Sequence, residues 1–325
     1  GRQLVSALDI AGEMKILGFI DDDELLHNQV LQGKKIYRAQ DLSKVIKLKK
    51  ITHIFLAIPS INRSQRTEII KKISIHNVII KALPTVGDLI EERVTISDIR
   101  ELEVEDILGR KQVLPNPQLL TKNISSKIIL VTGAGGSIGS ELCRQILKLN
   151  PKKLILIEIS EFALYQIQSE LEDINTKMNN DQIIEIIPLL ASVQDESRIQ
   201  NIMSTYKPDT LYHAAAYKHV PLVEENICEG VKNNVLGTSI VANAAITEKV
   251  SDFVLVSSDK AVRPTNIMGA SKRLAELCLQ ALFHNSKNSK TKLCMVRFGN
   301  VLNSSGSVIP KFKKQIKNGG PVTLT

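Results

Sequence analysis

Three residues with acid, base or hydroxyl groups follow one apolar segment of the chain. The segment from 257 to 272 reads "SSDKAVRPTNIMGASK" and places Ser258, Asp259 and Lys260 side by side. Carboxylates and amines are the usual groups of general acid–base catalysis. Neighbouring side chains of a strand point to opposite faces, so Asp259 and Lys260 can serve one substrate only where the strand has become a loop. Pro264 favours such a loop, and a solvated Asp–Lys pair is the alternative.

A second pair lies a few residues further on. Met268 and Lys272 are four positions apart, so a helix places both on one face. The Met268 thioether cannot take up a proton at neutral pH, and a methionine here is ordinarily core packing. By residue type the candidate catalytic residues are therefore Ser258, Asp259 and Lys260.

A glycine-rich turn lies earlier, between an apolar strand and an amphipathic helix. "KIILVTGAGGSIGSELCRQIL" carries its glycines in GxxGxxG spacing. Glycine lets the backbone approach a pyrophosphate closely, and a helix N-terminus offers free N–H groups and partial positive charge. Between a strand and a helix this spacing predicts a dinucleotide site. The expected contacts are Gly133, Gly136, Ser137, Ile138 and Gly139.

An acidic residue ends the next predicted strand. Glu158 follows Gly139 by roughly 20 residues, where a carboxylate accepts hydrogen bonds from the adenosine ribose. A carboxylate there repels a 2′-phosphate, which favours NAD over NADP, and a solvated strand-end glutamate is the alternative. Ala214 and Ala215 in "YHAAAYKHV" end another strand in small residues that leave room for a flat cofactor ring. His213 in the same motif is expected to pack or to hydrogen-bond.

Composition bounds the class of protein. The chain has 325 residues, 43% of them hydrophobic, and a net charge of +8. This length suggests two domains, and the charge suits an anionic partner such as a nucleotide. With no Trp and few Phe or Tyr there is no aromatic stacking platform for nucleic acid. Four cysteines without CxxC spacing predict no metal site or disulfide framework. The cysteine usage suits a reduced, cytoplasmic setting. No stretch of the sequence is apolar for long enough to predict a membrane-spanning helix.

Apolar runs separated by amphipathic helices predict parallel sheets with helices on their faces. The expected class is α/β with two Rossmann-like doubly wound domains, 1–84 and 126–325, joined by a connecting segment at 85–125. Both ends read as cut, because the chain opens on a helix-like pattern and stops on an apparent strand. Strands of the second domain are expected near 153–159, 183–188, 209–215, 252–258 and 292–298.

Six motifs occur in a characteristic order. They read TGAGGSIG, HAAAYKHVPLVEEN, NNVLGT, SSDK, MGASK and RFGNVLNSSGSVIP. In them the chain resembles the extended short-chain dehydrogenase/reductases, and more narrowly the CapD/WbpM-like UDP-N-acetylhexosamine 4,6-dehydratases of bacterial polysaccharide synthesis. The resemblance covers nearly the whole chain and implies a truncated CoA-binding-like first domain. It also implies a homo-oligomer, and membrane helices that anchor the full-length protein at the cytoplasmic face of the inner membrane.

The resemblance also implies individual roles. Met268 stands at the superfamily's catalytic tyrosine, and Lys272 at the lysine that holds the nicotinamide ribose. Asp259 would receive the carbon 4 hydroxyl proton and later deliver it to the departing carbon 6 hydroxyl, while Lys260 removes the carbon 5 proton. Further implied contacts are Ser192 and Val193 with the cofactor, and Lys218, His219, Asn300 and Ser307 with the substrate, although Lys218 and His219 could equally face solvent.

The predicted function is NAD-dependent dehydration of a UDP-N-acetylhexosamine, with UDP-N-acetylglucosamine favoured, to a 4-keto-6-deoxy sugar. An enzyme alternative is a sugar-nucleotide epimerase, which only oxidises and re-reduces carbon 4 and does not need the Asp259–Lys260 pair. An alternative of another class is a non-catalytic NAD or nucleotide-sugar regulator, which Met268 and the extra N-terminal domain favour.

Overall fold

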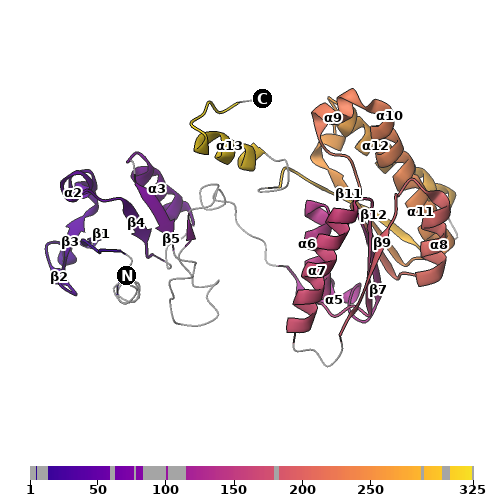
Figure 1. The fold of residues 1–325 in the computed structure, drawn as a ribbon, viewed down its shortest axis with the longest axis horizontal. Coiled ribbons are helices and arrows are strands. Elements are labelled where there is room, and N and C mark those ends of the chain that lie inside the picture. Colours follow the sequence, from indigo (N-terminus) through magenta and orange to yellow (C-terminus); the bar gives the residue numbers. More distant parts are fainter. Residues whose placement is uncertain are drawn as a thin grey trace. The chain divides into compact units, whose positions relative to one another are not determined.

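A computed structural model describes residues 5, 14–58, 63–76, 78–82, 100–101, 115–178, 183–286, 289–301 and 308–323. The chain divides into two compact units, Gly1–Val113 and Leu114–Thr325 (Figure 1). Most of the predicted connecting segment lies outside the described residues, so its boundaries stay a prediction. No helix within the described ranges is both long and apolar enough to cross a bilayer.

The second unit is built on a six-stranded parallel sheet of order β12-β11-β10-β7-β8-β9. The order runs outward in both directions from β7 and β10, and open sheets of this kind bind ligands at such a reversal, beyond the carboxyl ends of the strands. The predicted α/β class is confirmed. The strands are β7 (Ile128–Thr132), β8 (Lys153–Glu158), β9 (Glu185–Leu190), β10 (Thr210–His213), β11 (Asp252–Ser258) and β12 (Lys292–Phe298).

Helices cover both faces of this sheet (Figure 1). Alternate residues of β7 enter different cores, since Leu130 packs in one cluster, whereas Ile129 and Val131 pack in another. The longer helices are α6 (Ser137–Leu147), α7 (Glu161–Lys177), α8 (Glu196–Tyr206), α11 (Gly237–Thr247), α12 (Ile267–Asn285) and α13 (Val308–Lys317). Shorter ones are α5 (Pro117–Lys122), α9 (Val220–Glu225) and α10 (Ile227–Val231), together with the π-helix η5 (Lys232–Leu236) and the 3-10 turn η6 (Asp259–Ala261).

Side-chain caps fix where three of these helices begin. The oxygens of Ser160, Asp195 and Asn266 accept first-turn N–H groups of α7, α8 and α12 respectively. Such caps typically contribute about 1 kcal/mol each. They place each helix directly after the loop that leaves the carboxyl edge of the sheet.

The first unit has smaller sheets. Its described strands pair in the orders β1-β3-β2 and β4-β5-β6, with parallel pairing of β1 with β3 and of β4 with β5. A small core is formed by Leu56 together with Ile70 and Ile73 of the helix α3. The elements are β1 (Phe19–Asp21), η1 (Glu24–Leu26), β2 (Val30–Leu31), β3 (Lys34–Arg38), η2 (Ala39–Asp41), α2 (Leu42–Lys49), β4 (His53–Leu56), α3 (Arg63–Ser74), β5 (Ile79–Ala82) and β6 (Arg100–Glu101).

Candidate active site

The glycine loop between β7 and α6 leaves no space for side chains. Gly133 has a φ of +67°, a left-handed conformation that favours glycine, and a Cβ there would lie 2.6 Å from the Ala215 nitrogen. A Cβ on Gly139 would overlap the Gly133 carbonyl oxygen. Gly136 is the N-cap of α6 and supplies no side-chain hydrogen bond to the first turn. The loop therefore presents bare backbone and a helix N-terminus, as a pyrophosphate requires.

Glu158 ends β8 and contacts this loop. Its Oε2 accepts the Gly135 N–H at 3.0 Å, and its Oε1 accepts the N–H groups of Ile159 at 2.9 Å and Ser160 at 3.2 Å. Carboxylate oxygens can accept more than one hydrogen bond, so Glu158 can hold the loop and still receive ribose hydroxyls.

A cavity of about 280 Å³ joins these parts. Small residues from three strand ends leave the space, which suits a planar base and a ribose. Asn233 of η5 also borders the cavity, although it is not among the predicted cofactor contacts. The residues that line the cavity are Gly133, Gly135, Gly136, Ile157, Glu158, Ile159, Ala163, Ala191, Ser192, Val193, Ala214, Ala215, Ala216 and Asn233.

The residue set fits a dinucleotide. Of the predicted cofactor contacts, the structure gathers Gly133, Gly136, Glu158, Ser192, Val193, Ala214 and Ala215 around one cavity. Ser137, Ile138 and Gly139 lie beside it in the first turn of α6. The adjoining strand-end His213 is fully buried and bonds Thr132 Oγ1 at 2.7 Å and Thr238 Oγ1 at 3.0 Å. His213 therefore packs and hydrogen-bonds, as expected.

Lys272 projects from α12 into the interior of the unit. Its Nζ donates to the Val256 carbonyl oxygen at 3.1 Å. Burial lowers the pKa of Lys272 to about 8, while the Glu276 carboxylate acts in the opposite direction. Met268, one helical turn earlier, is only 4% exposed and packs in the core. The helix thus carries a buried cation but no proton-transfer group at position 268.

The strand β11 gives way to a loop at the predicted point. It ends at Ser258, and η6 follows directly, so Asp259 and Lys260 leave the strand alternation. Lys260 Nζ lies 3.3 Å from Asp259 Oδ1 and donates to Asn300 Oδ1 at 2.8 Å. The Ser258 hydroxyl donates to Asp259 Oδ1 at 3.1 Å and accepts the Lys260 N–H at 3.3 Å. Four of the predicted site residues therefore form one hydrogen-bonded cluster.

The parallel register brings Asn300 to this cluster. Ser258 pairs with Phe298, so the residues after each of these two strands leave the same edge of the sheet. The Asp259 side chain is 55% exposed. Partial desolvation raises the pKa of Asp259, but hydrogen bonds from Ser258 and Lys260 and the Lys260 charge outweigh it and hold the pKa below its usual range. Asp259 is thus a carboxylate at neutral pH.

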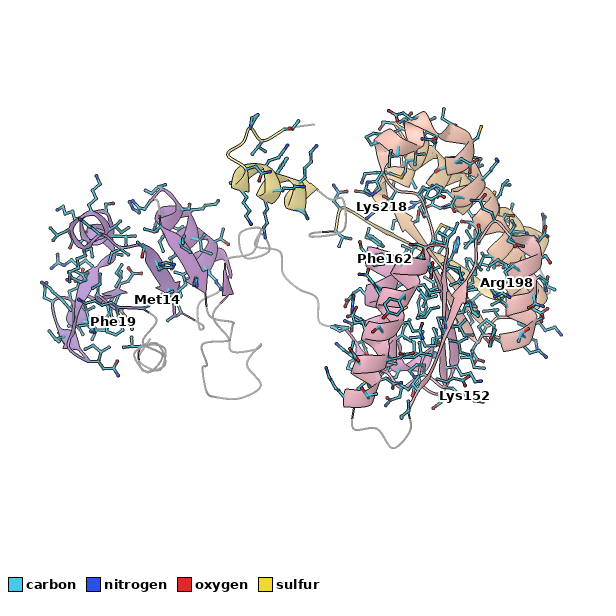
Figure 2. All side chains as sticks on the ribbon, viewed as in Figure 1. Met14, Phe19, Lys152, Phe162, Arg198 and Lys218 are labelled. Atoms are coloured by element: carbon cyan, nitrogen blue, oxygen red, sulfur yellow. The ribbon has the colours of Figure 1, made fainter. Side chains whose placement is uncertain are left out.

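Asn234 braces the neighbouring loop. It is buried in η5, where its Oδ1 accepts the Tyr217 N–H at 2.8 Å and its Nδ2 donates to the Tyr217 carbonyl at 3.0 Å. Nδ2 also donates to Ser271 Oγ on α12 at 3.0 Å. The next residues, Lys218 and His219, are exposed between β10 and α9 (Lys218 is labelled in Figure 2). Ser307 lies outside the described residues.

Glu276 is a site-adjacent residue that the motifs did not indicate. Its side chain is fully buried and accepts hydrogen bonds from Ser257, Arg273 and Arg297. Arg297 is therefore structural. Helical spacing could have indicated Glu276, because it follows Lys272 by one turn and so shares the same side of α12.

The strand order, the glycine loop and the lysine-bearing helix after β11 together define the extended short-chain dehydrogenase/reductase fold. The chain belongs to the family described as "Polysaccharide biosynthesis protein", which matches residues 129–325. It is 46% identical to the "Capsular polysaccharide biosynthesis protein CapD" of Staphylococcus aureus, over 100% of this chain and 53% of that protein.

Two further likenesses each cover about three fifths of the chain. The chain is 37% identical to a "UDP-glucose 4-epimerase" of Rickettsia prowazekii, over 61% of this chain and 56% of that protein. The X-ray structure of Pen from Bacillus thuringiensis is 35% identical and covers 62% of this chain and 61% of its own, with a TM-score of 0.57. The chain thus spans about half the length of the curated relatives it matches.

Proposed function

We propose that this chain belongs to an NAD-dependent dehydratase that converts a UDP-N-acetylhexosamine, UDP-N-acetylglucosamine by preference, to its 4-keto-6-deoxy product. One observation carries the proposal. Lys260 Nζ bridges the Asp259 carboxylate at 3.3 Å and the Asn300 amide at 2.8 Å. A paired acid and base at the carboxyl edge of the sheet is what elimination of water needs and what a simple carbon 4 oxidation does not.

Asp259 performs the proton transfers at oxygen. As a carboxylate it accepts the proton of the carbon 4 hydroxyl when that carbon is oxidised. It then delivers the same proton to the carbon 6 hydroxyl, which departs as water. This takes over the role of the tyrosine that Met268 replaces, and the lowered pKa of Asp259 supplies the required starting carboxylate.

Lys260 performs the transfer at carbon. Once carbon 4 is a ketone, the carbon 5 proton is acidic, and Lys260 removes it as the carbon 6 hydroxyl leaves. The lysine amine exchanges that proton with solvent, and a proton returns to carbon 5 after the double bond is reduced at carbon 6. Protonation of Asp259 in the preceding step removes the negative charge beside Lys260 before the carbon 5 proton is taken.

The cavity between the glycine loop and Glu158 would hold NAD, with Lys272 at its nicotinamide ribose. The chemistry that bound NAD supplies is reversible storage of a hydride between sugar carbons 4 and 6. Glu158 would favour NAD over NADP because its carboxylate would repel a 2′-phosphate. Small residues at the end of β10 leave room for the ring.

The first experiment incubates the protein with NAD and UDP-N-acetylglucosamine in deuterated water and follows product mass. Loss of one water with deuterium at carbon 5 is expected. Lys260→Met should stop carbon 5 exchange while cofactor reduction still occurs, and Lys152→Met is a control at an exposed lysine before the amino end of β8. Exchange at the parental rate in Lys260→Met would place the base elsewhere.

A second candidate function is epimerisation at carbon 4, which the likeness to a UDP-glucose 4-epimerase favours. An epimerase would return a sugar of unchanged mass and inverted carbon 4. A non-catalytic regulator would bind NAD or the nucleotide sugar and give neither product. The same incubation separates the three functions.

The setting of the full-length protein is a further part of the proposal. The family resemblance supports action on cytoplasmic nucleotide sugars, with the protein anchored at the inner face of the membrane and assembled as a homo-oligomer. Cell fractionation of the full-length protein tests the anchor, since recovery in the soluble fraction contradicts it. Light scattering tests the assembly.

A further inference from the structure

A fully buried carboxylate lies behind the Asp259–Lys260 loop. Glu276 Oε1 accepts the Ser257 hydroxyl at 2.7 Å and the Arg297 Nε–H at 2.7 Å, and its Oε2 accepts Arg273 at 3.1 Å and a second Arg297 nitrogen. Both carboxylate oxygens are thus occupied, and the Arg297 guanidinium binds them as a fork. Forked charge-assisted pairs fix direction as well as distance.

The partners of Glu276 come from the elements that carry the candidate catalytic groups. Ser257 immediately precedes Ser258 and the Asp259–Lys260 loop on β11. Arg297 lies near the end of β12, three residues before Asn300. Glu276 itself follows Lys272 by one turn of α12. One carboxylate therefore links the lysine-bearing helix to both strand ends.

Backbone hydrogen bonds cannot hold the two loops together beyond the ends of β11 and β12. The β11–β12 ladder stops at the pair of Ser258 with Phe298. Asp259, Lys260 and Asn300 lie past it, and the hydrogen bond from Lys260 Nζ to Asn300 Oδ1 joins the two loops there. Glu276 anchors the last residues of both strands just before that point.

A second contact brings the same helix against the loop. A Cβ on Gly269 of α12 would lie 2.6 Å from the Lys260 carbonyl oxygen, so helix and loop touch at backbone distance. A small rotation of α12 would therefore move Lys260. Glu276 lies two turns further along this helix and sets its orientation against the sheet.

We propose that Glu276 is a positioning residue for the reaction: it fixes α12 to the ends of β11 and β12, so that Asp259, Lys260 and Asn300 keep their geometry relative to Lys272. The inference rests on the proposed function for its catalytic part. Its structural part, that Glu276 holds the Asp259–Lys260 loop, can be measured without any turnover.

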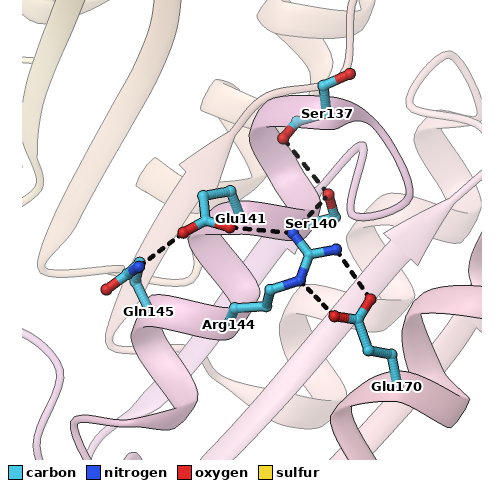
Figure 3. Close-up of polar contacts among 6 residues, drawn as sticks. All are labelled: Ser137, Ser140, Glu141, Arg144, Gln145 and Glu170. Atoms are coloured by element: carbon cyan, nitrogen blue, oxygen red, sulfur yellow. Dashed lines mark hydrogen bonds and ion pairs between the residues drawn. The ribbon is translucent and has the colours of Figure 1, made fainter. Parts of the chain in front are cut away.

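The molecule offers a matched control in a second Arg–Glu fork. Arg144 of α6 donates to Glu170 of α7 through Nε at 2.6 Å and a second nitrogen at 2.9 Å, and it also contacts Glu141 (Figure 3). This fork has the same chemistry but links two helices away from the Asp259–Lys260 loop. Glu170→Gln therefore removes the same charge from a fork whose carboxylate side chain is 43% exposed, whereas that of Glu276 is fully buried.

The test compares Glu276→Gln with Glu170→Gln. We expect Glu276→Gln to lower kcat on the order of 100-fold, with the KM for UDP-N-acetylglucosamine close to the parental value, because misplacement by about 1 Å is that costly. Amide hydrogen exchange in a peptide spanning residues 257–262 should become faster. Glu170→Gln should keep the parental kcat and exchange.

Parental kcat in Glu276→Gln, or an equal loss in both variants, overturns the proposal. Should Glu276→Gln fail to fold, Ser257→Ala keeps the charge pair and removes only the link to β11, and it should still accelerate exchange at residues 257–262. If the parent protein does not dehydrate the sugar, the proposed function falls. In that case unchanged exchange in Glu276→Gln is the result that overturns the positioning role.

Discussion

At the end of β7 the chain is held by its backbone, whereas at the ends of β11 and β12 it is held by side chains. Around Gly133 and Gly139 there is no space for a single added carbon. Around Asp259 and Lys260 the groups are partly exposed and linked by hydrogen bonds of 2.8 to 3.3 Å. The two regions lie on one sheet edge and differ in what keeps them in place.

The difference shows how each region can change. A backbone cradle tolerates almost no substitution, and it accepts the same ligand part whatever the reaction is. In a side-chain cluster, one proton-transfer group can be replaced by another. Under the proposed function, Asp259 has replaced the tyrosine whose position Met268 now occupies. Perturbing each region separately tests this contrast.

The largest effect is expected from removing the acid. Asp259→Asn keeps an oxygen for the Ser258 and Lys260 hydrogen bonds but cannot carry a proton. Turnover should fall by roughly 10²- to 10⁴-fold, the range of general acid–base catalysis, with NAD affinity retained. Steady-state kinetics with UDP-N-acetylglucosamine measure this, and Asp252→Asn at the opposite end of β11 is the control. An active Asp259→Asn variant would show that the proton carrier is another group.

The cofactor cradle should fail sterically. Gly139→Ala places a carbon on the Gly133 carbonyl oxygen, and relief of such overpacking costs about 1–3 kcal/mol, which is roughly a 10- to 100-fold loss in NAD affinity. Gly136→Ala provides the graded comparison, since its Cβ would lie 3.3 Å from the same oxygen and should have a smaller effect. Titration calorimetry checks both, and equal affinities would contradict the steric account.

Lys272 predicts a pH dependence. Burial lowers its pKa to about 8, so it is charged below that pH and neutral above it. NAD affinity should therefore fall as pH rises through 8, by up to about tenfold per pH unit. Of the groups around Lys272, His213 stays neutral here because burial lowers its pKa to about 3, and Glu276 stays charged.

The same group affects stability in the opposite sense. The folded pKa of Lys272 is depressed, so the unfolded chain binds more protons between about pH 8 and the ordinary lysine pKa. The free energy of unfolding contributed by this group should rise across that window. Lys272→Met should flatten both profiles, and a binding profile that keeps its slope would assign the titration elsewhere.

The smallest effect concerns cofactor choice. Glu158→Gln keeps an acceptor for the Gly135 N–H and removes the charge that repels a 2′-phosphate. The preference for NAD over NADP should weaken by about fivefold to tenfold, the value of one partly screened charge contact. Competition binding with both cofactors measures it, with Glu161→Gln on the adjacent helix as control.

The sequence predicted the cradle more fully than the cluster, for a physical reason. Glycine spacing, a strand and a helix are local, so Gly133 to Gly139 and Glu158 could be found from neighbouring residues. Glu276 and Arg297 are far apart in the chain, and only the folded register places both against Ser257. Asn234 belongs to the NNVLGT motif, but its partner Tyr217 is indicated by no spacing rule.

The ladder between β11 and β12 also limits how this protein can vary in length. Since side chains alternate along a strand, adding or deleting one residue within β12 would turn Asn300 away from Lys260. It would also move Arg297 to the sheet face opposite Glu276. Changes of length can therefore accumulate only before a strand starts or well after it ends. Insertions and deletions that survive in natural variants should avoid residues 292–300 for this reason.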